Sequence, residues 1–197
     1  MCWNSTVSLN TFLFSLFGGS FAYFNKVISF SIFLYFLSFI SIQLVEYFTW
    51  KNLHNQTVNR LLSQVAAFLI FIQIPLFVTC TLNYEEQPFV LGLYFLFSAF
   101  VYFSFPIDFS MKKAANGHLA WNWLKFPTWV IATWLSFLLG SLFYVKKYVD
   151  FALYSVVIAA IYYTYYKSNT WGSLWCWISN ILALKWISQV FLKDLCV

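Results

Sequence analysis

Long apolar segments with almost no charge dominate this sequence and restrict what it can fold into. A helix that crosses a bilayer needs about 20 mostly apolar residues, with a range of about 17–25. Seven stretches fit this pattern, roughly 8–25, 27–48, 61–82, 88–108, 127–145, 149–166 and 172–192. The first is interrupted by Gly18-Gly19-Ser20, but small residues also let membrane helices pack closely. We therefore expect an all-α membrane protein, a single bundle of about seven transmembrane helices with residues 1–197 as one membrane domain.

The composition excludes a water-soluble fold and points to a lipid bilayer as the main partner. The chain is 62% hydrophobic and only 9% charged, whereas soluble domains are about 45–50% apolar and about 25% charged. So few polar residues are not enough to cover a soluble core. The net charge of +5 comes from short basic runs between apolar blocks, which is typical of membrane topology and not of nucleic-acid binding.

The polar connections predict where the helices end. The longest, SMKKAANGHLAWNWLKFP, ends in Pro127, a residue suited to a helix start, and we interpret it as a loop. Pro75 within the third span predicts a kink. The four cysteines have neither CxxC nor zinc-finger spacing, so they do not predict a disulfide framework.

The distribution of basic residues predicts the orientation. We call the side of the bundle that holds the N-terminus the N-terminal face, and the other side the opposite face. The N-terminal face carries Lys51, Arg60, Lys112, Lys113, Lys125 and Lys167, and the opposite face carries Lys26, Lys146, Lys147 and Lys193. The positive-inside rule places the N-terminus in the cytoplasm. The sequons at Asn4 and Asn55 would then remain unmodified.

Unusual polar and reactive residues gather at the N-terminal face when the chain is threaded through seven spans. Gln43 and Glu46 lie near the end of the second span, and their spacing of three puts them on one helix face. Further candidates come from the chain start, the long loop and the last span. We predict a polar pocket that binds or passes a small ligand or ion, with candidate residues Cys2, Trp3, Gln43, Glu46, His118, Trp121, Asn122, Trp175, Cys176 and Asn180.

Each candidate also has a structural explanation. Glu46 lies close enough to a helix end to reach the interface, although intramembrane acids are often functional. Tryptophans near span ends commonly form the aromatic belt of a membrane protein. Asn180 could serve only to cross-link helices by a hydrogen bond. Cys2 and Trp3 could plug the end of the bundle, or Cys2 could be acylated.

Four motifs resemble those of a family of uncharacterised multi-pass membrane proteins, a domain of unknown function found in bacteria and in large viruses of eukaryotes. The opening MCWNS is similar to the family's Met-Cys-Trp-Ser or Met-Cys-Phe-Ser, with Asn4 inserted before or replacing the serine. The segments QLVEYFTW, HLAWN and LWCWISN resemble the family's motifs in the second helix, the long loop and a late helix. The resemblance implies that Cys2, Glu46, His118, Trp121 and Cys176 are signature positions, and it suggests a viral origin. It brings no established activity.

Two alternative functions remain open. In the first, the chain is an intramembrane enzyme in which Cys2 is the nucleophile or a metal ligand and His118 is the base or a ligand. A zinc site made of Cys2, Glu46, His118 and Cys176 has acceptable ligand chemistry, although their spacing gives it no support. In the second, the chain is a structural membrane protein of a virion or organelle.

Lys185 in the last span raises a further hypothesis. A lysine in the last helix of a seven-helix protein is typical of a retinal Schiff base. Two observations oppose this cofactor. Lysine side chains extend readily to a nearby interface, and we expect no acid near the opposite half of the bundle interior to act as a counter-ion. At Lys185 the resembling family also carries an apolar residue.

Overall fold

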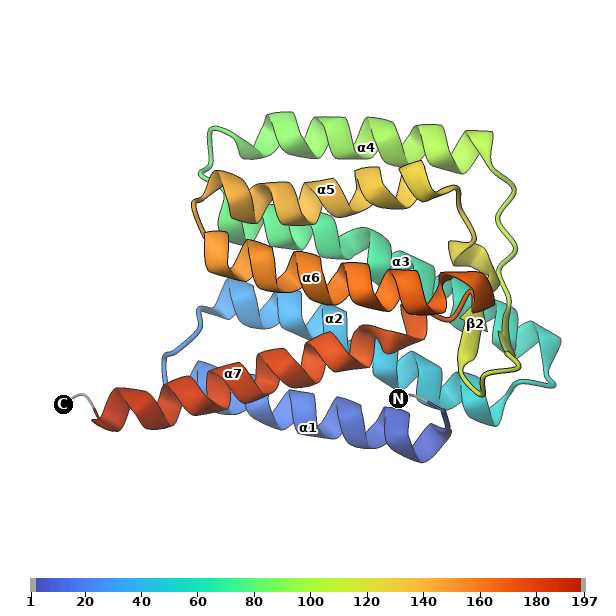
Figure 1. Ribbon diagram of the computed structural model, residues 1–197, viewed down its shortest axis with the longest axis horizontal. Helices are drawn as coiled ribbons and strands as arrows, with labels where there is room; N and C mark the ends of the chain where they lie inside the picture. The colour runs from blue at the N-terminus through green and yellow to red at the C-terminus, as the bar shows by residue number, and fades with distance from the viewer. Residues whose placement is uncertain (1–2, 196–197) are drawn as a thin grey trace.

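The computed structural model describes residues 3–195, and all of their side chains except those of Leu174 and residues 193–195. Over these residues the chain is almost entirely helical. Its seven α-helices are α1 (Ser5–Phe24), α2 (Phe30–Lys51), α3 (Gln56–Thr81), α4 (Gln87–Ser104), α5 (Thr128–Tyr144), α6 (Tyr148–Tyr165) and α7 (Trp175–Leu195). Consecutive helices run in opposite directions, so α1, α3, α5 and α7 all begin at the N-terminal face, on the right in Figure 1.

The helical architecture predicted from the apolar segments is confirmed, because each of the seven predicted segments overlaps one helix. Among the helices that the structure describes, α1, α2, α3, α4 and the segment 148–168, which contains α6, are long and apolar enough to cross a membrane. The apolar helix α5, with 17 residues, is shorter. The structure thus has five helices with the length and composition of membrane spans.

Three of the helices begin with a side-chain cap. Asn4 Oδ1 accepts a hydrogen bond from Val7 N (2.9 Å) at the start of α1, and Asn55 Oδ1 accepts one from Val58 N (3.1 Å) at the start of α3. Ser29 caps α2 in the same way. Asparagine and serine are favoured at this position because they satisfy a backbone N–H that has no partner within the helix. Capping therefore explains the asparagine of each sequon.

Small residues allow α1 to pack closely against α7 and α2. A Cβ atom added to Gly18 would lie 2.8 Å from the Cβ of Ala183, and one added to Gly19 would lie 2.7 Å from Phe36 Cδ1. The Gly-Gly-Ser sequence therefore does not interrupt α1, which continues to Phe24. The two glycines allow close contact between helices, as is common in membrane bundles.

The outer faces of α4 and α6 are apolar and exposed. Phe103 on α4 is 84% exposed and Tyr163 on α6 is 90% exposed, and most of their aromatic neighbours also point outward. A soluble monomer rarely exposes apolar patches of this kind. In Figure 1, α4 forms one edge of the bundle, which leaves one side of the helix without a protein neighbour. These surfaces suit contact with lipid chains.

The long connection between α4 and α5 is not the unstructured loop that we expected. It forms an antiparallel hairpin of β1 (Met111–Lys113) and β2 (Leu119–Trp121), in which Met111 pairs with Trp121 and Lys113 with Leu119. A short 3₁₀ turn at Asn122–Leu124 follows the hairpin, and two more, Tyr166–Ser168 and Gly172–Leu174, lie in the α6–α7 connection. The hairpin lies at the N-terminal face (Figure 1). It forms there because α3 and the α6–α7 connection bind its backbone, an influence that no local pattern reveals.

Candidate functional site

A buried asparagine attaches the hairpin to the bundle. Asn59, one turn into α3, donates from Nδ2 to the carbonyl of Met111 and accepts from the amide of Met111, both at 2.9 Å. The side chain of Asn59 thus takes the place of an adjacent strand for one residue of β1. Because Asn59 is buried, loss of either bond would leave an unsatisfied polar group.

Trp121 projects from β2 into the bundle and is fully buried. The α6–α7 connection fixes its backbone, since Asn169 Nδ2 donates to the Trp121 carbonyl (2.7 Å) and the Trp121 amide donates to the Asn169 carbonyl (3.2 Å). Gly172 provides space for the ring, because a Cβ at this position would lie 2.5 Å from Trp121 Cε3. Trp123 stacks on the Trp121 ring with a centroid distance of 5.0 Å.

The centre of the site is the carboxylate of Glu46 in α2, which has no exposed surface. Trp121 Nε1 donates to Glu46 Oε1 at 3.2 Å. The amide of Gln43, oriented to satisfy both of its ends, donates to Glu46 Oε2 at 3.2 Å and accepts from the amide of Cys176 at 3.3 Å. We call Gln43, Glu46, Trp121 and Cys176 the carboxylate cluster. It joins α2, the hairpin and the start of α7.

The other predicted site residues lie around this cluster and have different contacts. Trp175 Nε1 donates to Gln73 Oε1 of α3 at 3.3 Å. Asn122 Nδ2 donates to Ser110 Oγ at 2.8 Å, which braces the hairpin. Asn180 Oδ1 accepts from Ser15 Oγ at 3.3 Å and so links α7 to α1. This hydrogen bond between two helices is the structural role that the sequence suggested for Asn180.

His118 lies in the hairpin, where its ring packs edge-on against Tyr165 (5.7 Å between centroids) and Trp3 (6.5 Å). Burial lowers the pKa of His118 below its usual value, because desolvation disfavours the imidazolium. Cys2, predicted as a nucleophile or ligand, lies outside the described residues. Within residues 3–195, no three His, Cys, Asp or Glu side chains are grouped closely enough to hold a metal ion.

The interior also contains a cavity towards the opposite face. Its volume is about 290 Å³, and its walls include Tyr35, Phe39, Asp150, Tyr154, Trp175 and Lys185. Lys147 and Gln189, both exposed, line its outer end. The cavity therefore leads from the surface towards the middle of the bundle.

Lys185 has an acidic partner, so the expectation that no acid lies near this half of the interior is wrong. Lys185 Nζ lies 2.6 Å from Asp150 Oδ1, and both side chains are about one-third exposed or less. Asp150 belongs to the first turn of α6, where a carboxylate is favoured by the helix dipole. Asp150 lies within the predicted span 149–166, but its carboxylate was not assigned to the interior of the bundle.

One face of α2 connects the cavity with the carboxylate cluster. Tyr35, Phe39, Gln43 and Glu46 follow at spacings of four, four and three, which places them on the same side of a helix. Tyr35 and Phe39 line the cavity, and Gln43 and Glu46 belong to the cluster. Phe39 stacks on Trp175 with a centroid distance of 5.5 Å. This aromatic pair therefore lies where the cavity ends and the cluster begins.

A carboxylate in such surroundings has limited chemistry. Because Glu46 has no exposed surface, a charge on it would depend on N–H donors of the protein such as those of Trp121 and Gln43. A carboxylate of this kind can hold a proton or a small cation, and acids inside membrane bundles are often part of ion and substrate pathways. Aromatic faces such as those of Tyr35, Phe39 and Trp175 attract cations as well.

Comparison with known proteins gives no relative. No family model matches the chain, and neither the curated proteins nor the solved structures contain a significant match. The resemblance to the uncharacterised membrane family therefore remains an expectation from four motifs.

Proposed function

We propose that this chain is an integral membrane protein with seven spans, whose interior binds and passes a small cation between the cavity and the carboxylate cluster. The observation that carries the proposal is the buried face of α2, on which Tyr35 and Phe39 line the cavity and Gln43 and Glu46 form the cluster. The exposed apolar faces of α4 and α6 support the membrane location.

In this proposal the charge of the ligand follows from the groups along the path. Glu46 supplies the negative charge, Gln43 an amide oxygen, and Phe39 and Trp175 the aromatic walls. At the cavity mouth, Asp150 pairs with Lys185, which reduces the repulsion between that ammonium group and a cation that enters. Passage requires Phe39 and Trp175 to separate, so the structure corresponds to a state that is closed at the N-terminal face.

The test is cation flux into liposomes that contain the purified protein, with K⁺, Na⁺, H⁺ and tetramethylammonium as probes. Glu46→Gln keeps the size of the side chain and removes its charge, and we expect it to abolish flux. Glu85→Gln is the matched control, since Glu85 is exposed on the α3–α4 connection. Flux that persists in Glu46→Gln at the level of Glu85→Gln would contradict the proposal.

A further inference from the structure

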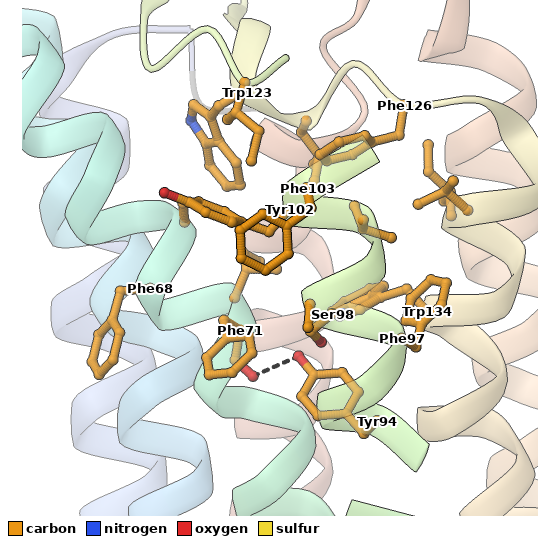
Figure 2. A pocket seen from close by; sticks show the side chains of 18 of the residues that line it. Phe68, Phe71, Tyr94, Phe97, Ser98, Tyr102, Phe103, Trp123, Phe126 and Trp134 are labelled. Carbon is orange, nitrogen blue, oxygen red and sulfur yellow. Dashed lines mark hydrogen bonds between the residues drawn. The ribbon is translucent and has the colours of Figure 1, made fainter. Parts of the chain in front are cut away.

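A second and larger cavity lies between α3, α4 and α5, apart from the carboxylate cluster. Its volume is about 710 Å³, within the range of about 300–1,000 Å³ that is typical of ligand pockets. Figure 2 shows that aromatic side chains surround it, among them Phe71, Phe97, Phe126 and Trp134. The walls are therefore suited to an apolar ligand.

The two ends of this cavity are well defined. At the hairpin end lies Trp123, which follows β2. At the other end lies Tyr94 of α4, whose hydroxyl donates to the carbonyl of Phe71 at 2.8 Å (Figure 2). Because this bond satisfies the hydroxyl of Tyr94, the inner end of the cavity offers a ligand mainly apolar surface.

The length of the cavity matches one leaflet of a bilayer. Along α4 its lining runs from Tyr94 to Phe103. Nine helical steps of about 1.5 Å give about 14 Å, and half of a hydrocarbon core of about 30 Å is about 15 Å. The cavity begins at the N-terminal face, so it lies at the depth of the acyl chains in the adjacent leaflet.

A positive charge lies at the end of the cavity where a lipid headgroup would be. Lys125 is exposed, and its neighbours in the sequence, Leu124 and Phe126, both line the cavity. An ammonium group next to the interface attracts the phosphate of an anionic lipid. The apolar groove and the adjacent cation together match the two parts of a phospholipid.

We propose that the cavity between α3, α4 and α5 binds an anionic phospholipid of the leaflet at the N-terminal face, with one acyl chain between Tyr94 and Trp123 and the phosphate beside Lys125. The proposal rests on the membrane location proposed above, but not on cation passage. It assigns a lipid site to a part of the bundle that the carboxylate cluster does not use.

The first test maps lipid contacts in the unmodified protein. The protein is reconstituted into phosphatidylcholine vesicles containing a small share of phosphatidylglycerol with a photoreactive group halfway along one acyl chain. After illumination, mass spectrometry locates the adducts. We expect them to concentrate on the cavity lining of α3, α4 and α5. An even distribution over the exposed faces of α4 and α6 would overturn the proposal.

Variants make the test specific. Ser98→Trp fills the cavity from α4 and should reduce the adducts several-fold. Gly92→Trp is the matched control on the same helix, because Gly92 is exposed and a Cβ added there meets nothing within 4 Å, and it should leave the adducts unchanged. Lys125→Gln should reduce labelling by phosphatidylglycerol several-fold and leave labelling by the equivalent phosphatidylcholine probe unchanged, with the exposed Lys112→Gln as its control. Equal labelling of every variant would overturn the proposal.

The two proposals fail in different ways. A protein that does not float with the vesicles would overturn both, because both need a membrane. A protein that floats and is labelled in the cavity, but whose cation flux survives Glu46→Gln, would keep the lipid site and lose the proposed function. Abolished flux in Glu46→Gln together with even labelling would keep the proposed function and overturn the lipid site.

Discussion

Glu46 depends on donors that come from other parts of the chain. Trp121 brings an indole N–H from the hairpin, and Gln43 brings an amide that is itself held by the backbone of α7. A carboxylate without exposed surface needs such donors, because an unpaired charge in an apolar interior is very costly. The cluster therefore contributes to stability as well as to any ligand chemistry.

Replacing Trp121 by Phe should destabilise the protein strongly. The change removes the indole donor to Glu46, and hydrogen bonds to charged groups contribute about 1.5–3 kcal/mol. We expect the free energy of unfolding to fall by at least that amount, measured by denaturant titration in detergent micelles. Trp129→Phe is the control, since Trp129 is 51% exposed, and it should change stability little.

A double-mutant cycle separates the hydrogen bond from the lost packing. In the Glu46→Gln background, the acceptor is no longer charged, so Trp121→Phe should cost less than it does in the original protein. Additive effects of the two substitutions would show that the bond from Trp121 to Glu46 contributes little.

Gly172 should tolerate no side chain. A methyl group there would lie 2.5 Å from the ring of Trp121, and overpacking of this kind costs about 1–3 kcal/mol. Gly172→Ala should therefore lower the thermal midpoint of unfolding. Gly92→Ala, in open space on α4, should leave it unchanged or raise it, since alanine favours helix more than glycine does. Equal midpoints for the two variants would contradict the packing described here.

At the scale of elements, the hairpin depends on α3 for its position. Asn59→Ala removes both hydrogen bonds to Met111 and should let the hairpin separate from the bundle more often. We expect faster hydrogen exchange across residues 111–121, measured by mass spectrometry. Asn52→Ala is the control, because the Asn52 side chain bonds, among the described residues, only to the carbonyl of Phe48 in the preceding helix. Unchanged exchange in Asn59→Ala would show that other contacts position the hairpin.

The helices were predictable from the sequence, and the hairpin was not. Apolar segments of about 20 residues define helices almost independently of their partners, since a bilayer core offers the backbone no other donors or acceptors. The hairpin instead depends on Asn59 and Asn169, which are distant in the sequence, and an asparagine near a helix end is ordinarily assigned to capping.

The candidate site was predictable in part. The spacing of Gln43 and Glu46 predicted that they share a helix face. The sequence placed Trp121 at the same end of the bundle, but it did not reveal the hydrogen bond from Trp121 to Glu46. Asp150 lies within the predicted span 149–166, but the sequence did not show that its carboxylate faces Lys185 of α7.

At the scale of the molecule, the orientation stays a prediction that one labelling experiment can decide. If the N-terminal face is cytoplasmic, a membrane-impermeant amine reagent applied to intact cells should modify Lys146 and Lys147, which are exposed on the α5–α6 connection, and spare Lys112 and Lys113 in the hairpin. Permeabilised cells should show all four modified. The reverse pattern in intact cells would invert the topology.

The bond between Trp121 and Glu46 also affects how the protein is made. The two residues are 75 positions apart, and ribosomes add about 5–20 residues per second, so α2 is synthesised about 4–15 seconds before its indole donor. In the membrane location proposed above, Glu46 of the nascent chain lacks the Trp121 donor during this interval. Chains that stop before the hairpin would lack this donor to Glu46 permanently.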